Sequence, residues 1–376
     1  EPGQVAGEYL RRREQGIPPK RVTDAPVKEV VHRDGVDLLA TLPVPTYHEK
    51  DGGPYVTCGV VVARDPASGQ RSMGLHRLQV KGKTRTGIHL TNPPIAAFFR
   101  EAEARGQPLE IAVALGADPI VLLASIMRSA IGDKLEVAGA LRGEPIELVP
   151  GETVSLEVPA GAEAILEGRI LPHVREEEGP FGEVSQYYFS DVSHVVEITA
   201  ITHRQQPVIQ ALHPTAREVS VLAGIPAEFE ILRLLRAQGF AVEAVRISGG
   251  TSYPHAVFSI RQTKTGQARQ ALFVLLSSMG FIKHAVAVDE DVDLDDPRDV
   301  EWALATRVQA DEDLVVLTGL VGSSVDPSAE ARGVTAKVGV DATKPFRERE
   351  RFERIGVPAE VRERARAVAA RYLDRR

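Results

Sequence analysis

The sequence predicts an α+β protein with two domains, and three observations support this class. Its 376 residues, 43% of them apolar and 26% charged, suffice for two or three cores at about 150 residues each. Up to about residue 214, short strand-like runs alternate with Gly and Pro turns. From residue 215 onward, longer helices and strands alternate. We therefore expect a mainly β domain, built as a small barrel or split sheet, followed by an α/β domain.

Composition and charge exclude several classes of protein. The net charge of −7 disfavours a general nucleic-acid binder, because such proteins carry a basic face. No apolar run approaches the roughly 18 residues of a membrane span, and the N-terminus lacks the pattern of a secretory signal. A single cysteine, Cys58, excludes an internal disulfide framework. These features predict a cytoplasmic protein with no membrane span and no nucleic-acid partner.

Turn signals and strand periodicity place the elements of the first half. Residues 1–35 contain a short helix over EYLRRREQG, a proline-containing connector and the strand VKEVV. The runs YVTCGVVVAR and GLHRLQV, joined by the turn formers of DPASGQR, predict a β-hairpin over residues 55–80. Three elements follow: a helix over 94–105, a strand over 109–115 and a helix that starts at Asp118-Pro119. The rest, up to residue 204, is predicted mostly as short strands such as VSLEVP, EAILEGRIL and HVVEITAITHR.

The second half alternates between helical and strand patterns. The expected elements, in order, are helix 227–238, strand 241–247, strand 255–261, helix 266–279, strand 284–288, helix 298–306 and strand 313–318. Pro358 opens a final Arg-rich helix, whose alanine face is expected to dock on the body or on a partner subunit. The chain is accordingly divided into an N-terminal helix and connector (1–35), a β domain (36–214), an α/β domain (215–346) and a C-terminal helix (347–376).

The segment REEEGPFGEVSQYY, residues 175–188, carries the first candidates for chemistry. Two glycines and a proline between Glu178 and Glu183 predict a tight turn that aims both carboxylates into one space. In a partly dry pocket, paired carboxylates have separated pKa values, so one of them can hold a proton near neutral pH and act as a general acid. The alternative is that these acidic residues form a solvent-exposed loop, which is common for such runs. Phe181 in the middle of the segment argues for burial instead.

Two basic residues complete the candidates. On the strand GLHRLQV, period 2 places Arg77 on one face with Leu75 and Gln79. An inward arginine needs a partner, such as a carboxylate of EGPFGE, whereas an exposed surface arginine needs none. Lys337 lies among small residues in GVTAKVGVDATKP, where a phosphate could approach closely.

Six segments, in order along the chain, resemble the signature segments of the UbiD family, the reversible decarboxylases that use prenylated FMN (prFMN). They are YVTCGVVVARDP with GLHRLQVKGKTRTG, AGALRGEPIELV, VPAGAEAILEG, EGPFGE, VDEDVDLDDPRDVEWALATR and KVGVDATKP. The resemblance extends from about residue 20 to residue 346. It implies a flavin-binding split β-barrel domain, a C-terminal α/β domain and an active site between them, with residues 1–35 as the remnant of a larger N-terminal subdomain.

The resemblance also implies roles for individual residues. The family's Glu-Arg-Glu network falls on Arg77, Glu178 and Glu183. An aromatic or unsaturated carboxylate would lose CO2 on the flavin, Glu183 would deliver the proton, and Arg77 and Glu178 would position the substrate and maintain the cofactor. The residues expected to bind the cofactor are Ser72, Met73, Gly74, Leu75, Arg77, Lys134 and Lys337. A flavin prenyltransferase would supply the prFMN, and the enzyme would be a homo-oligomer.

One part of the family pattern is not matched. In the family, an Asn, a His and a Glu hold a divalent metal ion and a potassium ion at the flavin phosphate. Ser72, Pro94 and Lys134 stand at these positions, although a two-residue shift would supply Glu136 for the third. Hard cations need oxygen or imidazole ligands that these side chains do not provide, whereas a lysine can meet a phosphate directly. We therefore expect prFMN without a metal ion, or a site in which cofactor binding is loosened or lost.

The leading hypothesis is a UbiD-like decarboxylase acting on an aromatic or α,β-unsaturated carboxylic acid. The second is a non-catalytic or assembly subunit that keeps the fold but has lost the metal and cofactor site. The third is a related enzyme that uses plain flavin, or no flavin, for another reaction. The presence of Arg77, Glu178 and Glu183 together favours a catalytic protein.

Overall fold

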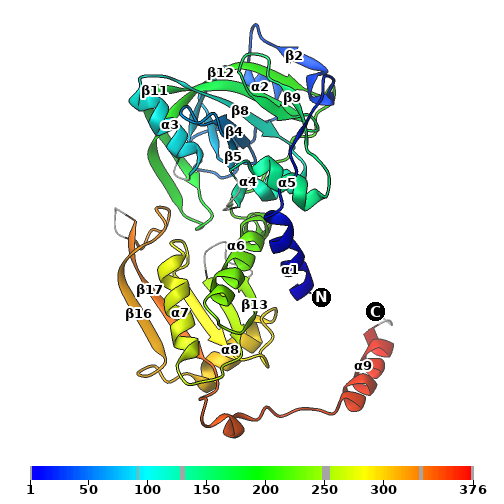
Figure 1. Cartoon of the computed structure of the whole chain (residues 1–376), viewed down its shortest axis with the longest axis vertical. Helices are drawn as coiled ribbons and strands as arrows, with labels where there is room; N and C mark the ends of the chain where they lie inside the picture. The colour runs from blue at the N-terminus through cyan, green and yellow to red at the C-terminus, as the bar shows by residue number, and fades with distance from the viewer. Residues whose placement is uncertain (1, 91–92, 128–131, 248–254, 330–332, 374–376) are drawn as a thin grey trace.

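A nine-stranded sheet organises the N-terminal half of the chain and a five-stranded sheet organises the C-terminal half (Figure 1). The computed structural model describes residues 2–90, 93–127, 132–247, 255–329 and 333–373. Among these residues, no helix is both long enough and apolar enough to cross a membrane. The prediction of an α+β fold, with the β domain first, is confirmed.

The nine-stranded sheet brings together strands from most of the first 203 residues. Its strands are β2 (Val30–His32), β3 (Tyr55–Val56), β4 (Val60–Arg64), β5 (Arg71–Leu75), β6 (Leu78–Val80), β7 (Arg85–Ile88), β8 (Leu109–Leu115), β11 (Ala164–Gly182) and β12 (Tyr188–His203). They pair in the order β3-β6-β7-β12-β11-β8-β4-β5, with β2 beside β12. In this order the first strand, β3, and the last strand, β5, do not pair with each other, so the sheet is not a closed barrel. A separate three-stranded sheet contains β1 (Lys20–Arg21), β9 (Glu147–Pro150) and β10 (Glu157–Pro159).

The helices of the first half are α1 (Pro2–Arg13), η1 (Pro26–Lys28), α2 (Leu38–Thr41), α3 (Ile95–Ala104), α4 (Pro119–Ile126) and α5 (Lys134–Arg142). Among them, α3, α4, α5 and η1 pack on this sheet while α1 packs on α5 and on α6 (Arg217–Ala237), and local sequence fixes several of their ends. The Asp118 carboxylate caps α4 by accepting from the Ile120 amide, and Asp133 caps α5 by accepting from Leu135. Gly143 ends α5 with φ of 90°, a conformation that glycine adopts without strain.

The C-terminal half is an α/β layer structure. Its elements are α6 (Arg217–Ala237), β13 (Val242–Ile247), β14 (His255–Ile260), α7 (Gln267–Ser278), β15 (His284–Val288), α8 (Pro297–Arg307), β16 (Leu314–Val321), β17 (Val334–Ala342), η2 (Arg349–Phe352) and α9 (Ala359–Leu373). The sheet order is β13-β14-β15-β17-β16, with a parallel centre and antiparallel edge strands. One core lies between the sheet, α6 and α7, and a second contains residues of α8.

Several predicted elements agree with the structure and others need correction. Strands 109–115 and 284–288 have the predicted bounds, and the hairpin over 55–80 is present as β4 paired with β5. Residues 136–142, predicted as the start of a region of short strands, belong instead to α5 (Lys134–Arg142), which Asp133 caps as a helix. Helix α6 begins at Arg217 rather than at residue 227 and contains Pro226 in its interior. Strand β17 was not predicted, because its pairing with β15 and β16 joins segments that are distant in the sequence.

The final helix is formed, but it does not dock on the body. Figure 1 shows α9 set apart from both domains at the end of an extended segment. Its side chains are exposed from Ala359 through Tyr372, including the expected alanine face. The expectation of docking on the body is therefore wrong, and docking on a partner subunit stays a prediction.

Candidate active site

Arg77, Glu178 and Glu183 lie together in the β domain. Arg77 follows β5, Glu178 lies in β11 and Glu183 comes directly after it. The Arg77 guanidinium donates from Nε to Glu178 Oε1 (3.0 Å) and from Nη2 to Glu178 Oε2 (2.7 Å), and its Nη1 pairs with Glu183 Oε1. The side chain of Glu178 is 1% exposed, while Arg77 and Glu183 are 10% and 12% exposed. One guanidinium thus holds two carboxylates in a mostly dry space.

The two carboxylates converge through a strand irregularity, not through the predicted tight turn. The EGPFG run is the end of β11, and the chain reverses only at residues 183–187. Residues five apart on a regular strand lie on opposite faces. Here Glu178 pairs with Asp191 and Phe181 with Phe189, so β11 contains one extra residue between them. This bulge changes the phase of the strand, and both glutamates reach Arg77. The prediction of a tight turn between them is wrong, whereas their convergence is observed.

Aromatic rings enclose the arginine. Its Cζ atom lies 4.8 Å from the centroid of Phe181 and 5.9 Å from that of Phe189. Tyr55 packs on Phe181 with ring centroids 4.3 Å apart, and among the described residues its buried hydroxyl makes no hydrogen bond of normal geometry, although it lies close to Glu178. Burial, followed by the negative charge of Glu178, raises the pKa of Tyr55, so the phenol stays protonated. The Tyr55 hydroxyl is therefore an available hydrogen-bond donor beside the glutamates.

A loop that the sequence analysis did not single out fixes the backbone around both glutamates. We call residues 47–52 the support loop. The side chain of Asp51 is 0% exposed, and it accepts from the amides of Tyr47 (3.1 Å), His48 (2.8 Å) and Gly182 (2.9 Å). Gly182 is the residue before Glu183, so Asp51 fixes the base of that side chain. The Gly182 position leaves no room for a side chain, because a Cβ there would meet the His48 ring.

The support loop also contacts the Glu178 side of the bulge. The Gly52 amide donates to the carbonyl of Pro180 (2.7 Å). The Gln79 side chain donates to Gly52 O (3.0 Å) and accepts from the Gly179 amide (3.3 Å). Gly179 has φ of +110° and would clash with the Phe189 carbonyl if it carried a Cβ, which would lie at 2.7 Å. These contacts join segments about 130 residues apart, so no local pattern in the sequence indicates them.

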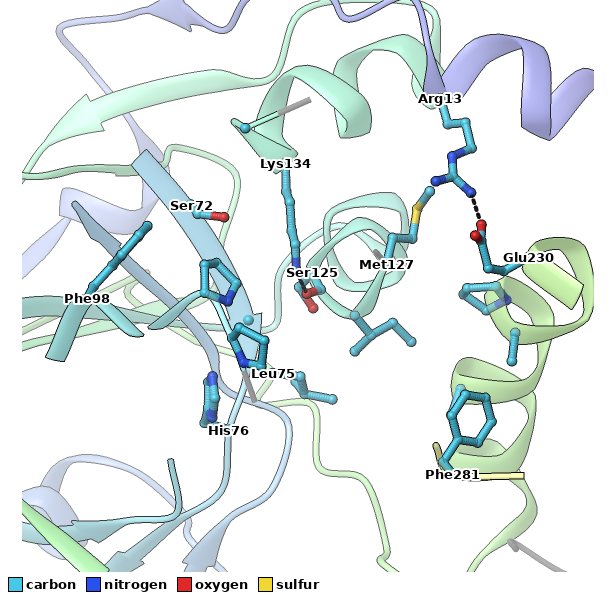
Figure 2. A pocket seen from close by; sticks show the side chains of 18 of the residues that line it. Arg13, Ser72, Leu75, His76, Phe98, Ser125, Met127, Lys134, Glu230 and Phe281 are labelled. Atoms are coloured by element: carbon cyan, nitrogen blue, oxygen red, sulfur yellow. Dashed lines mark hydrogen bonds and ion pairs between the residues drawn. The ribbon is translucent and has the colours of Figure 1, made fainter. Parts of the chain in front are cut away.

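A cavity of about 930 Å³ lies between the two halves of the chain, and its lining reaches His76, the residue before Arg77, but does not include the three cluster residues themselves. Its wall includes β5, the residue before Arg77, the α4–α5 region, and α1 and α6 (Figure 2). Of the predicted cofactor residues, those that line it are Ser72, Gly74, Leu75 and Lys134. Pro94 lines it as well, while Glu136 is not among the described lining residues. The three positions at which the family pattern is not matched thus face the same space.

The polar side chains of the cavity are few and mostly engaged. Lys134 is 7% exposed, and its Nζ donates to the Ser125 carbonyl (2.6 Å); burial lowers its pKa to about 8. His76 Nδ1 lies 3.2 Å from the His89 carbonyl and must donate to it, which leaves Nε2 unprotonated, and burial lowers the His76 pKa to about 4. Arg13 pairs with Glu230 (2.7 Å) across the cavity rim, as Figure 2 shows.

The other three predicted cofactor residues, Met73, Arg77 and Lys337, are not among the described lining residues, and Arg77 is engaged by the two glutamates. Met73 is fully buried in the core beneath β5. Lys337, on β17, donates to the carbonyls of Leu276 (3.1 Å), Met279 (2.9 Å) and Gly280 (3.1 Å), which cap the end of α7. All three ammonium protons are used there, so Lys337 could reach a phosphate only after giving up a helix cap.

Comparison with known proteins decides the family. Residues 20–216 match the 3-octaprenyl-4-hydroxybenzoate carboxy-lyase Rift-related domain (UbiD), and residues 220–342 match the corresponding C-terminal domain. The chain belongs to the UbiD family. The expectation of a UbiD-type carboxy-lyase, made from six sequence segments, is thereby confirmed.

Individual relatives cover most of this UbiD chain. The solved structure of the UbiD-class enzyme HmfF from Pelotomaculum thermopropionicum, in complex with FMN, is 45% identical with a TM-score of 0.90, over 95% of this chain and 81% of that one. An evolved dimeric form of HmfF was solved in complex with prFMN. The anhydromevalonate phosphate decarboxylase of Methanothermobacter thermautotrophicus is 40% identical over 86% of this chain and 77% of its own length. The gallate decarboxylase of Lactiplantibacillus plantarum is 31% identical over 93% and 79%.

Proposed function

We propose that this UbiD protein reversibly decarboxylates an aromatic or α,β-unsaturated carboxylic acid with prFMN bound in the 930 Å³ cavity. The observation that carries the proposal is the cluster of Arg77, Glu178 and Glu183, whose arginine directly follows His76 in the wall of that cavity. The volume lies within the usual range of about 300–1,000 Å³ for ligand pockets. Gly74 leaves the β5 wall open, since a Cβ there would lie 2.7 Å from His76 Nε2. The Tyr9 hydroxyl in the wall has no hydrogen-bond partner among the residues that the structure describes, so it can bind a polar group of the cofactor.

The charges of the cluster suggest how Glu183 obtains its proton. Arg77 supplies one positive charge, and Glu178 and Glu183 supply two negative charges. A substrate carboxylate adds a third, and competition for the guanidinium favours protonation of Glu183, because Glu183 has one contact with Arg77 whereas Glu178 accepts two hydrogen bonds from it. When bound, prFMN supplies the acceptor for the electron pair released as CO2 leaves. Glu183 then transfers its proton to the substrate carbon, while Glu178 stays paired with Arg77 and keeps it oriented.

One experiment tests this proposal against the other hypotheses. The protein is co-expressed with a flavin prenyltransferase, its expected cofactor supplier, and its ultraviolet–visible spectrum is recorded. A panel of aromatic, heteroaromatic and α,β-unsaturated acids is then assayed for CO2 release and for deuterium incorporation. We expect bound modified flavin and turnover of at least one class. Absence of flavin would favour the non-catalytic subunit, which the residues Ser72, Pro94 and Lys134 make the second candidate.

The support loop gives an expected result for a residue outside the cluster. Asp51→Asn keeps the shape of the side chain, but its amide group cannot accept from all three backbone N–H groups. The displaced Gly182 would move Glu183, and misplacement on the order of 1 Å can cost about 10²-fold in rate. We expect kcat to fall at least about tenfold while KM and FMN affinity change little. Exposed Asp34→Asn is the control, and an unchanged kcat in Asp51→Asn would remove the support loop from the mechanism.

We also propose that α9 mediates self-association. One face of this helix carries exposed apolar side chains of Val361, Val368 and Tyr372, with 46%, 52% and 71% exposure. Their spacing of seven and four residues places them on one side. The double substitution Val361→Glu/Val368→Glu is expected to lower the mass measured by light scattering, because it charges that face. Val192→Glu, exposed on β12, is the control. An unchanged mass would exclude α9 as the contact.

A further inference from the structure

We propose that Lys134 binds the flavin phosphate directly, so that this site holds its cofactor without a divalent metal ion. The inference rests on the proposed function, because it assumes that a flavin mononucleotide occupies the cavity. It concerns how the phosphate is recognised, which none of the relatives' names describes.

The position of Lys134 supports a role inside the cavity. The residue begins α5, directly after the capping Asp133, and its side chain extends into the space between α5 and β5 (Figure 2). Its one hydrogen bond among the described residues goes to the Ser125 carbonyl (2.6 Å), which leaves two ammonium protons for a ligand. Ser72 lies on the same wall and offers a hydroxyl donor. A phosphate between them would accept from both side chains.

The charges around Lys134 fit an anion. Lys134 is only 7% exposed. Even so, within the part of the chain that the structure describes, its ammonium makes no ion pair with a carboxylate. The neighbouring Asp133 is paired with Arg71 (2.7 Å) instead. A buried ammonium without a counter-charge is costly, and a phosphate would supply that charge. Burial lowers the pKa of Lys134 to about 8, and a phosphate beside it would favour its charged form.

The side chains that line the cavity do not suit a metal ion. Across residues 2–90, 93–127, 132–247, 255–329 and 333–373, no group of three or more His, Cys, Asp or Glu side chains could hold one. Of the described residues that line the cavity, Glu230 carries the only carboxylate, and it is paired with Arg13. Lys134 itself would repel a cation at the position where the family has a glutamate. A protonated lysine has no acceptor atom with which to bind one.

The test compares two flavins that differ only in the phosphate. Apoprotein treated with a chelator is titrated with FMN and with riboflavin, by quenching of flavin fluorescence, with and without added Mn²⁺. We expect FMN to bind more tightly than riboflavin without metal, and Mn²⁺ to leave its Kd unchanged. Lys134→Met is expected to weaken FMN binding about tenfold or more, as for loss of a hydrogen bond to a charged group, and to leave riboflavin binding unchanged.

Two further variants test whether the positive charge of Lys134 is what binds the phosphate. Lys134→Arg, which keeps the charge, should restore most of the FMN affinity, and exposed Lys264→Met should behave like the parent. The melting temperature of each variant checks the fold. A stoichiometric divalent metal in elemental analysis, or FMN binding that needs Mn²⁺, would overturn the inference while leaving the proposed function intact. If neither flavin binds, the proposed function itself fails.

Discussion

Glu183→Gln is expected to reduce turnover by at least about 10²-fold, the scale on which a general acid contributes. Glutamine keeps the size and shape of the side chain, and its amide can still accept from Arg77, so the cluster stays assembled. It has no acidic proton to transfer to the substrate carbon. The expected signature is therefore a fall in kcat with unchanged FMN affinity and unchanged melting temperature. Steady-state CO2 release and deuterium incorporation into the product should fall together, because each turnover must complete the proton transfer before the next substrate can react.

The same strand offers a matched control for this variant. Glu177 precedes Glu178 on β11, and its side chain is exposed on the opposite face. Glu177→Gln removes the same charge from the same strand and should retain the parent rate. If Glu183→Gln kept near-parental decarboxylation, another group would have to supply the proton. The buried hydroxyl of Tyr55, beside Glu178, would then be the next candidate.

The elements that the sequence predicts best are those defined by local signals. Strand β8 and helix α4 are recognisable because an apolar run ends at Gly116 and an Asp-Pro pair follows it. Helix α5 was missed because the apolar and small residues of its segment fit a strand as well as a helix. The Asp133 cap that decides between them is a single residue. Strand β17 was missed because its pairing with β15 and β16 depends on residues distant in the chain.

The site shows the same division between local and distant information. Two glycines and a proline indicated that Glu178 and Glu183 could meet, although the cause is a bulge in β11 and not a turn. The pairing of Arg77 with both was expected from the cost of an unpaired inward arginine, and the contacts are observed. Asp51 carried no signal, because one aspartate in a Gly-rich loop resembles an ordinary turn residue. Its three amide partners are known only once the fold is known.

Arg77→Met is expected to damage activity and stability together. Methionine fills part of the space but leaves Glu178, which is 1% exposed, without its partner. Removing one member of a buried ion pair typically costs about 3–5 kcal/mol, since the other charge stays desolvated. Arg85→Met is the control, because Arg85 pairs with Glu176 on the same sheet but is 44% exposed. An exposed pair contributes at most about 1 kcal/mol. Denaturant unfolding of both variants measures the difference.

A second substitution separates the two effects of Arg77. In the double variant Arg77→Met/Glu178→Gln, the more deeply buried of the two stranded charges is gone, while Glu183, which is 12% exposed, still lacks its partner, so part of the lost stability should return. Activity should not return, because no guanidinium remains to bind the substrate carboxylate and to hold Glu183 in place. Recovery of stability without recovery of kcat would assign Arg77 to the reaction itself. If both returned, Arg77 would serve only to neutralise Glu178, and substrate positioning would have to come from another side chain. If neither returned, the loss would come from packing against Phe181 and Phe189, whose rings lie 4.8 Å and 5.9 Å from the guanidinium carbon.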